Sequence, residues 1–295
     1  MTNRVSTKFQ YDSSLNRIHT AYQRMFNAQQ SVVTGKKQDL VVNDPGGASF
    51  IVRASTLKTS VEQYQKNLRS AEQTLKQSES VYTEMKTMLQ EAYGLALQSA
   101  NTTLDQTGRN AMAKQVETMM TRLVDLGNTQ SASGDYIFAG KKIDTKPYSV
   151  TGAGIVYSGD AGQRVVESGP GSTLSITVGD SATFSQAYQA LNDMKNHLLS
   201  GNISLLGGQS VGDLQKSMDA TKLLVGDIGA RMQQVQEQNN QHQRRVDDLT
   251  QRISDVEDVD MAEAISEYQL AQTVYQAALQ TTSIMDRMSL MDFMR

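Results

Sequence analysis

Hydrophobic residues recur every three or four positions along most of this chain, which is the spacing that one face of an α-helix requires. The longest series lies between residues 211 and 256, and a second of similar length lies between 57 and 99. Both keep a 3.5-residue period through about six heptads, a pattern that holds one helix against a partner helix. We therefore predict two long helices that pack side by side.

The seams of these two helices are mostly apolar. Asn239 and His242 interrupt the later seam, and we interpret them as residues that fix the register of the pair rather than as a chemical site. The later seam consists of Val211, Leu214, Met218, Thr221, Val225, Ile228, Met232, Val235, Asn239, His242, Val246, Leu249, Ile253 and Val256. The earlier seam consists of Leu57, Val61, Tyr64, Leu68, Ala71, Leu75, Ser78, Tyr82, Met85, Leu89, Ala92, Ala96 and Ser99.

Shorter helices are expected near both ends and between the long ones. The predicted ranges are 9–33, 108–127, 184–199 and 261–294, with a flexible linker at 34–47 and a glycine turn at 207–208. Asp44 followed by Pro45 marks a helix start, because Asp caps the first turn and Pro suits the first helical position. Asp260, three residues before Glu263, resembles a capping box and marks a second helix start.

Residues 134–182 have a different composition from the rest of the chain. They hold nine of the 21 glycines, separated by short β-branched or aromatic runs at 136–138, 155–157, 165–166 and 174–178. Such runs between glycine turns predict a small antiparallel sheet. The Gly152-Ala-Gly and Gly169-Pro-Gly segments do not open a helix after a strand, so they do not indicate a phosphate-binding loop.

The predicted fold is mainly α with a β insertion: a long antiparallel helical bundle or coiled coil with a small antiparallel β domain. Three domains follow from the order of the elements. Residues 1–44 with 257–295 form terminal helices that are mobile in the monomer, and 45–133 with 183–256 form the long helical bundle. Residues 134–182 form the β domain.

Composition argues against most chemical functions. The formal net charge is −3, and acidic and basic residues are mixed along the chain, so the sequence does not indicate a surface for nucleic acid. No apolar run approaches the length of a membrane span. The absence of cysteine excludes thiolate metal sites. His19, His197 and His242 lie far apart in the sequence, and none neighbours a serine, aspartate or metal-ligand grouping that would make a catalytic triad or a site. We therefore expect no enzyme, metal or cofactor, although sequence alone does not exclude a glycosidase-like pair of carboxylates.

The terminal helices instead suggest assembly. Both carry an apolar stripe, and isolated amphipathic helices are only marginally stable in water until something covers them. If neighbouring copies cover them through a head-to-tail contact that does not close, the product is a tube or filament. The residues expected in this assembly interface are Leu15, Ile18, Tyr22, Met25, Val32, Ala264, Tyr268, Ala271, Tyr275, Ala278, Met285, Leu290 and Phe293.

Several segments resemble the flagellar hook-associated proteins of type three, which form the junction between hook and filament. The resemblance covers nearly the whole chain, with methionine where the family's C-terminal segment usually has leucine. Its segments are Arg4-Val-Ser-Thr, Thr34-Gly-Lys-Lys, Asn43-Asp-Pro, Asn128-Thr-Gln, Gly134-Asp-Tyr-Ile-Phe-Ala-Gly140, Lys146-Pro-Tyr, Val156-Tyr-Ser-Gly-Asp160, Asp258-Val-Asp-Met-Ala-Glu-Ala-Ile265 and Ser289-Leu-Met-Asp-Phe293.

The resemblance implies a secreted structural protein that passes unfolded through the flagellar type III export apparatus. It implies terminal helices that are disordered in the free monomer and order as an inner coiled-coil tube on assembly. The implied partners are the other hook-filament junction protein, flagellin, further copies of the chain and an export chaperone, with no nucleic acid or membrane. Flagellin itself is the nearest alternative, and a signalling coiled coil is a more remote one.

Overall fold

The computed structural model describes residues 2–38, 40–101, 105–152, 154–177 and 181–293, excluding the side chains of 2–8, 10, 41, 101 and 285–293. The chain divides into two compact units, Met1–Ser60 with Arg245–Arg295 and Val61–Arg244. In chain order the elements are α1 (Thr2–Thr34), α2 (Leu40–Asn43), α3 (Pro45–Asn101), α4 (Gln106–Gly127), β1 (Tyr148–Thr151), β2 (Gly154–Tyr157), β3 (Val165–Gly169), β4 (Ser172–Ser175), α5 (Ser181–Ser200), α6 (Ile203–Leu205), a π-helical turn η1 (Leu206–Ser210), α7 (Val211–Glu257) and α8 (Met261–Phe293).

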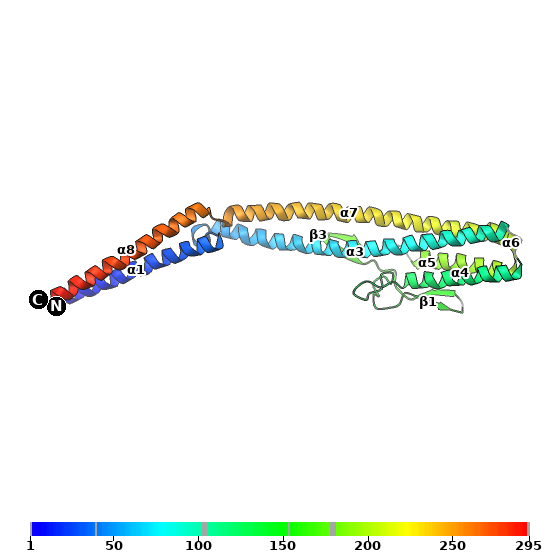
Figure 1. Cartoon of the computed structure of the whole chain (residues 1–295), viewed down its shortest axis with the longest axis horizontal. Helices are drawn as coiled ribbons and strands as arrows, with labels where there is room; N and C mark the ends of the chain where they lie inside the picture. The colour runs from blue at the N-terminus through cyan, green and yellow to red at the C-terminus, as the bar shows by residue number, and fades with distance from the viewer. Residues whose placement is uncertain (1, 39, 102–104, 153, 178–180, 294–295) are drawn as a thin grey trace. The chain divides into compact units, whose positions relative to one another are not determined.

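The two long helices α3 and α7 run side by side in the second unit, as the heptad pattern predicts (Figure 1). The side-chain amide of Gln65 donates to Oε1 of Gln243 at 3.1 Å, and the ring centroids of Tyr64 and His242 are 5.9 Å apart. Every predicted seam residue of both helices is buried or half-buried. The paired long helices are therefore confirmed. The part of the seam from Leu68 to Ala96 on α3 and from Leu214 to Val235 on α7 forms one core with α4 and α5.

The β segment forms two separate antiparallel hairpins rather than one sheet. β1 pairs with β2 and β3 pairs with β4, so strands form where three of the four predicted runs lie. The fourth run, at 136–138, is not a strand: Tyr136 makes only an isolated bridge to Gln130. Phe138 is buried instead against Tyr82 and Phe184, with ring centroids 5.4 and 5.1 Å apart. Tertiary packing therefore overrides the β propensity of this run.

The predicted helix starts are confirmed, but the glycine turn at 207–208 is not. Asp44 accepts a hydrogen bond from the backbone N–H of Gly47 at 2.8 Å, and α3 begins at the next residue after Asp44. Asp260 accepts one from the N–H of Ala262 at 2.8 Å, and α8 begins directly after it. Gly207 instead lies in η1, which continues into α7. The two glycines therefore belong to a helical turn.

Candidate assembly surface on the terminal helices

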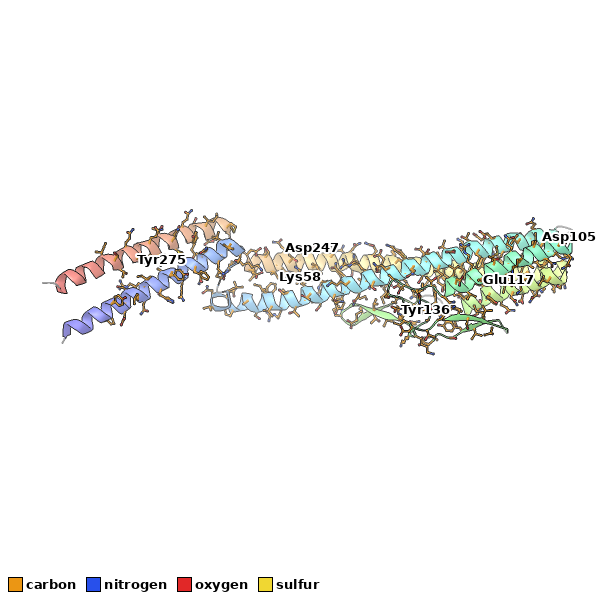
Figure 2. The ribbon with its side chains drawn as sticks, turned by 60° about the horizontal axis from the view of Figure 1, so that its bottom comes forward. Lys58, Asp105, Glu117, Tyr136, Asp247 and Tyr275 are labelled. Carbon is orange, nitrogen blue, oxygen red and sulfur yellow. The ribbon has the colours of Figure 1, made fainter. Side chains whose placement is uncertain are left out.

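Helices α1 and α8 pack against each other along their length, and α1 begins beside the end of α8 (Figures 1 and 2). On α1 the seam contains Ser14, Ala21 and Ala28, which are buried and lie seven residues apart. Between them Ile18, Met25 and Val32 are half-buried. The small side chains allow the two helix axes to approach closely, and they also limit the apolar area that the pair buries.

The structure places most of the predicted assembly residues in this intramolecular seam. On α8, Ala264 is buried, whereas Tyr268, Ala271, Tyr275 and Ala278 are half-buried, as the spacing predicts for a seam. Figure 2 labels Tyr275 on α8, and its ring centroid lies 5.7 Å from that of Tyr22. The predicted residues Met285, Leu290 and Phe293 lie outside the described side chains.

Leu15 and Tyr22 lie at the edge of the seam rather than within it, although the sequence pattern places them on one stripe with Ile18, Met25 and Val32. The side chains of Leu15 and Tyr22 are 45% and 46% exposed. The ring of Tyr22 still packs against Tyr275 of α8. The seam of α1 uses the small residue one position earlier, Ser14 or Ala21, at each of these turns. A pattern that counts only large apolar residues therefore misassigns the phase of α1 at these two positions.

The displaced residues form a second surface on α1, which we call the apolar stripe. Four of its residues each directly follow a seam residue: Leu15, Tyr22, Phe26 and Val33. One position along the sequence corresponds to about 100° around a helix, so these side chains lie to one side of the seam. The ring centroids of Tyr22 and Phe26 are 6.4 Å apart, so these two aromatic side chains contact each other. The apolar stripe consists of the exposed residues Tyr11, Leu15, Tyr22, Phe26 and Val33. Exposed apolar patches of this kind mark interaction sites.

A groove of about 460 Å³ lies between α1 and α8, and a cavity of about 490 Å³ adjoins it along α1. The small residues Ala21, Ala28 and Ala271 line the groove together with the exposed apolar residues Leu270 and Val274. Arg24, Lys37 and Glu267 also line it and supply its charged groups. The groove therefore combines apolar surface with charged side chains.

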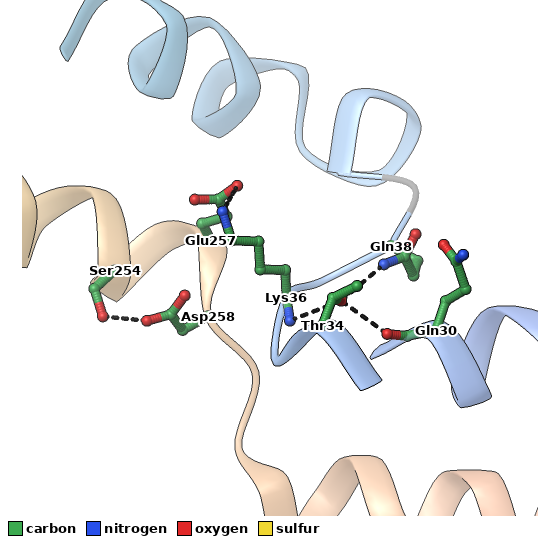
Figure 3. A network of polar contacts seen from close by, with 7 residues as sticks. All are labelled: Gln30, Thr34, Lys36, Gln38, Ser254, Glu257 and Asp258. Atoms are coloured by element: carbon green, nitrogen blue, oxygen red, sulfur yellow. Dashed lines mark hydrogen bonds and ion pairs between the residues drawn. The ribbon is translucent and has the colours of Figure 1, made fainter. Parts of the chain in front are cut away.

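The segment between α1 and α2 is tied to the segment between α7 and α8. The backbone N–H of Lys37 donates to the Glu257 carbonyl at 2.8 Å, and that of Val259 donates to the Gly35 carbonyl at 3.0 Å. Nζ of Lys36 lies 2.9 Å from Oε1 of Glu257 (Figure 3). Since the lysine is about half exposed, this ion pair contributes less than about 1 kcal/mol. The predicted flexible linker is therefore held by backbone hydrogen bonds at this point.

The segments Gly134–Gly140 and Val156–Asp160 meet at Asp160. Its Oδ1 accepts hydrogen bonds from the backbone N–H groups of Lys141 and Gly162, at 2.7 and 2.9 Å. These two donors hold the pKa of the Asp160 carboxyl below its usual value, so it is ionised at neutral pH. The Tyr157 hydroxyl lies 2.9 Å from the Asp160 carbonyl, and burial raises the pKa of Tyr157. These groups close the loop around Gly140.

The histidines do not form a site open to substrate. Nδ1 of His197 lies 2.9 Å from Oγ of Ser210, although the two residues are 13 positions apart in the sequence. The fold joins these residues because α5 packs on η1, but Ser210 is 1% exposed and cannot reach a substrate. Nε2 of His242 lies 2.7 Å from the Ser168 carbonyl, so this ring helps to dock β3 on α7.

Metal-binding and membrane-spanning features are not found within the described residues. No three His, Asp or Glu side chains in that part of the chain are arranged to hold a metal ion. Likewise, none of the described helices combines the length and the apolar character needed to cross a membrane.

Comparisons with known proteins relate both ends of the chain to one family. Residues 5–143 match the bacterial flagellin N-terminal helical region, and residues 210–294 match the bacterial flagellin C-terminal helical region. Flagellar hook-associated protein 3 of Escherichia coli is 24% identical over 97% of this chain and 98% of its own length. Flagellin of Listeria monocytogenes is 22% identical over 63% of this chain and 70% of its own length.

A solved structure shares the fold. The structure of a putative flagellar hook-associated protein from Vibrio parahaemolyticus superposes with a TM-score of 0.68 at 18% identity. The match covers 73% of this chain and 99% of that structure. The similarity supports the arrangement of long helices with a small β part described above.

Proposed function

Because the chain carries both helical regions of bacterial flagellin and belongs to the flagellin-like proteins, we propose that it is a structural protein of the flagellum that joins the hook to the filament. The observation that carries this proposal is the apolar stripe on a terminal helix pair whose own seam contains small residues. A surface of this kind serves assembly rather than catalysis. The similarity covers 98% of the length of hook-associated protein 3 but 70% of the length of flagellin, which favours the junction over the filament.

The stability of the α1–α8 pair fits a role in assembly. Ser14, Ala21 and Ala28 bury little apolar area, and a helix pair without a substantial core is marginal in water. In the proposal, residues 1–44 and 257–295 form an assembly domain that is mobile in the monomer and becomes ordered when neighbouring copies cover it. Residues 45–133 with 183–256 form the long bundle, and residues 134–182 form the β domain.

The proposed partners follow from this position in the flagellum. Copies of the chain form a ring or tube, the other junction protein binds on the hook side, and flagellin binds on the filament side. An export chaperone holds the C-terminal region before the chain is secreted unfolded through the type III apparatus. The predicted interface residues in the α1–α8 seam order the pair, while Leu15 and Tyr22 of the apolar stripe face other copies.

Immunogold labelling of flagella in the host tests this function. Deleting the gene should leave hooks without filaments and release flagellin into the medium, and restoring the gene should return the filaments. The label on the restored cells should form one band between hook and filament. Label spread along the filament would indicate a filament subunit instead, and normal filaments in the deletion strain would contradict the proposal.

A further inference from the structure

The helix pair has two different faces. The start of α1 and the end of α8 lie together at one end of the pair, so the two helices are antiparallel (Figure 1). In an antiparallel pair, residues one position after the seam on each helix share one face, and residues one position before it share the other.

The exposed residues follow this rule on both helices. Tyr22 and Phe26 follow seam residues of α1, and Ile265 and Leu279 follow seam residues of α8, so these apolar side chains share one face. Six of the residues that line the groove each precede a seam residue by one position: Arg24, Asn27, Ser31, Glu267, Leu270 and Val274. The apolar stripe and the groove therefore lie on opposite faces of the same pair.

We propose that the apolar stripe of one copy packs into the groove of the next copy, an inference that rests on the proposed function and names the contact that builds the junction. The two surfaces match in length: Tyr11 to Val33 spans about 33 Å of helix, and the groove with its adjoining cavity follows α1 from Phe9 to Ser31, also about 33 Å.

The groove also presents apolar side chains to an incoming stripe. Leu270 and Val274 line it and are exposed, so Tyr22 and Phe26 of the next copy can bury apolar surface against them. Packing of stripe against stripe would instead bring large side chains together and leave the groove unfilled. At the groove, Arg24 and Glu267 form no ion pair with another described residue, so both remain available to polar groups of the incoming copy.

The opposite placement of the two surfaces has a consequence for symmetry. Each copy offers one stripe and one groove, so every contact leaves a free stripe at one end and a free groove at the other. Such a heterologous contact repeats into a ring or a helical tube, whereas a stripe-to-stripe contact closes at a dimer. The heterologous contact is the one that a junction of many copies needs.

Disulfide cross-linking in flagella tests the contact, since the natural chain contains no cysteine. Cells would produce Phe26→Cys on the stripe together with Arg24→Cys or Ser31→Cys in the groove, and each single variant as a control. After oxidation of isolated hook-filament fragments, a double variant should give a ladder of cross-linked species beyond the dimer. The single variants should remain monomeric. Phe26→Cys with Gln23→Cys, an exposed residue one position after Tyr22, is the matched control and should give no ladder.

The cross-linking results distinguish the stripe-in-groove contact from a stripe-to-stripe contact. Dimers from Phe26→Cys alone, or no ladder from either double variant, would overturn the stripe-in-groove contact. If these variants do not reach the junction, Leu15→Cys with Thr20→Cys, which lines the adjoining cavity, repeats the test with the same criteria. A missing ladder with an intact junction band contradicts this inference alone, whereas a missing band in unmodified cells contradicts the proposed function.

Discussion

Leu68→Ala should lower the free energy of unfolding of the chain by about 2–5 kcal/mol. Leu68 lies on the seam of α3 and is 0% exposed. Removing its buried methyl groups loses their transfer free energy and leaves a cavity that the rigid neighbouring helices fill only in part. Ile228→Ala, at a fully buried seam position of α7, should give a loss of similar size.

Urea denaturation followed by circular dichroism measures this effect. Leu223→Ala provides the matched control, because Leu223 lies on α7 with a side chain that is 75% exposed. Its free energy of unfolding should change by no more than about 0.5 kcal/mol. Equal denaturation midpoints for Leu68→Ala, Ile228→Ala and the unchanged chain would mean that the paired long helices do not form the core.

Gly140→Ala should destabilise the β segment by about 2–5 kcal/mol. Gly140 has a φ of 69°, in the left-handed region that L residues other than glycine avoid. A Cβ at this position would also lie 2.2 Å from Oδ1 of Asp160 and 2.3 Å from its carbonyl oxygen. The new methyl group would therefore break the loop that Asp160 closes, in addition to the cost of the backbone conformation.

Gly134→Ala separates these two costs. Gly134 also has a positive φ, of 89°, but an added Cβ would meet nothing within 4 Å. Its loss should therefore be limited to the backbone cost of about 1–2 kcal/mol. Thermal unfolding monitored by near-ultraviolet circular dichroism of the tyrosines compares the two variants. Equal losses would show that the contact between Gly140 and Asp160 has no structural importance.

The sequence predicts the long helices well because a single physical rule governs them. A residue such as Leu68 or Ile228 becomes buried when it faces the partner helix. The 3.5-residue period keeps apolar residues on that face through many heptads. Asp44 and Asp260 likewise act on backbone groups a few residues away, so their capping role is visible locally. These features need no knowledge of distant parts of the chain.

The features that sequence misses depend on distant contacts or on small side chains. Phe138 leaves the expected strand because Tyr82 and Phe184, far away in sequence, bury it. His197 meets Ser210 only because α5 packs on η1. On α1, a search for large apolar residues passes over Ala21 and Ala28, which form the seam because they let α8 come close.

The same error in phase bears on function. If Leu15 and Tyr22 belong to the seam, all the large apolar residues of α1 lie on one face, and the helix has a single interface. The structure separates an internal seam of small residues from an external stripe of large ones, so one helix can hold α8 and a neighbouring copy at once. A signal for this exists in the sequence, because an aromatic or leucine residue directly follows Ser14, Ala21 and Met25 in turn.

The central claim is that the apolar stripe stays uncovered in the single molecule and becomes covered when copies assemble. The most direct test is maleimide labelling of a Phe26→Cys variant, since it introduces the chain's sole thiol. The thiol should react rapidly in the free protein, where Phe26 is 47% exposed, and slowly in isolated hook-filament junctions. A thiol that is already protected in the free protein, or that stays equally reactive in the junction, would contradict the account.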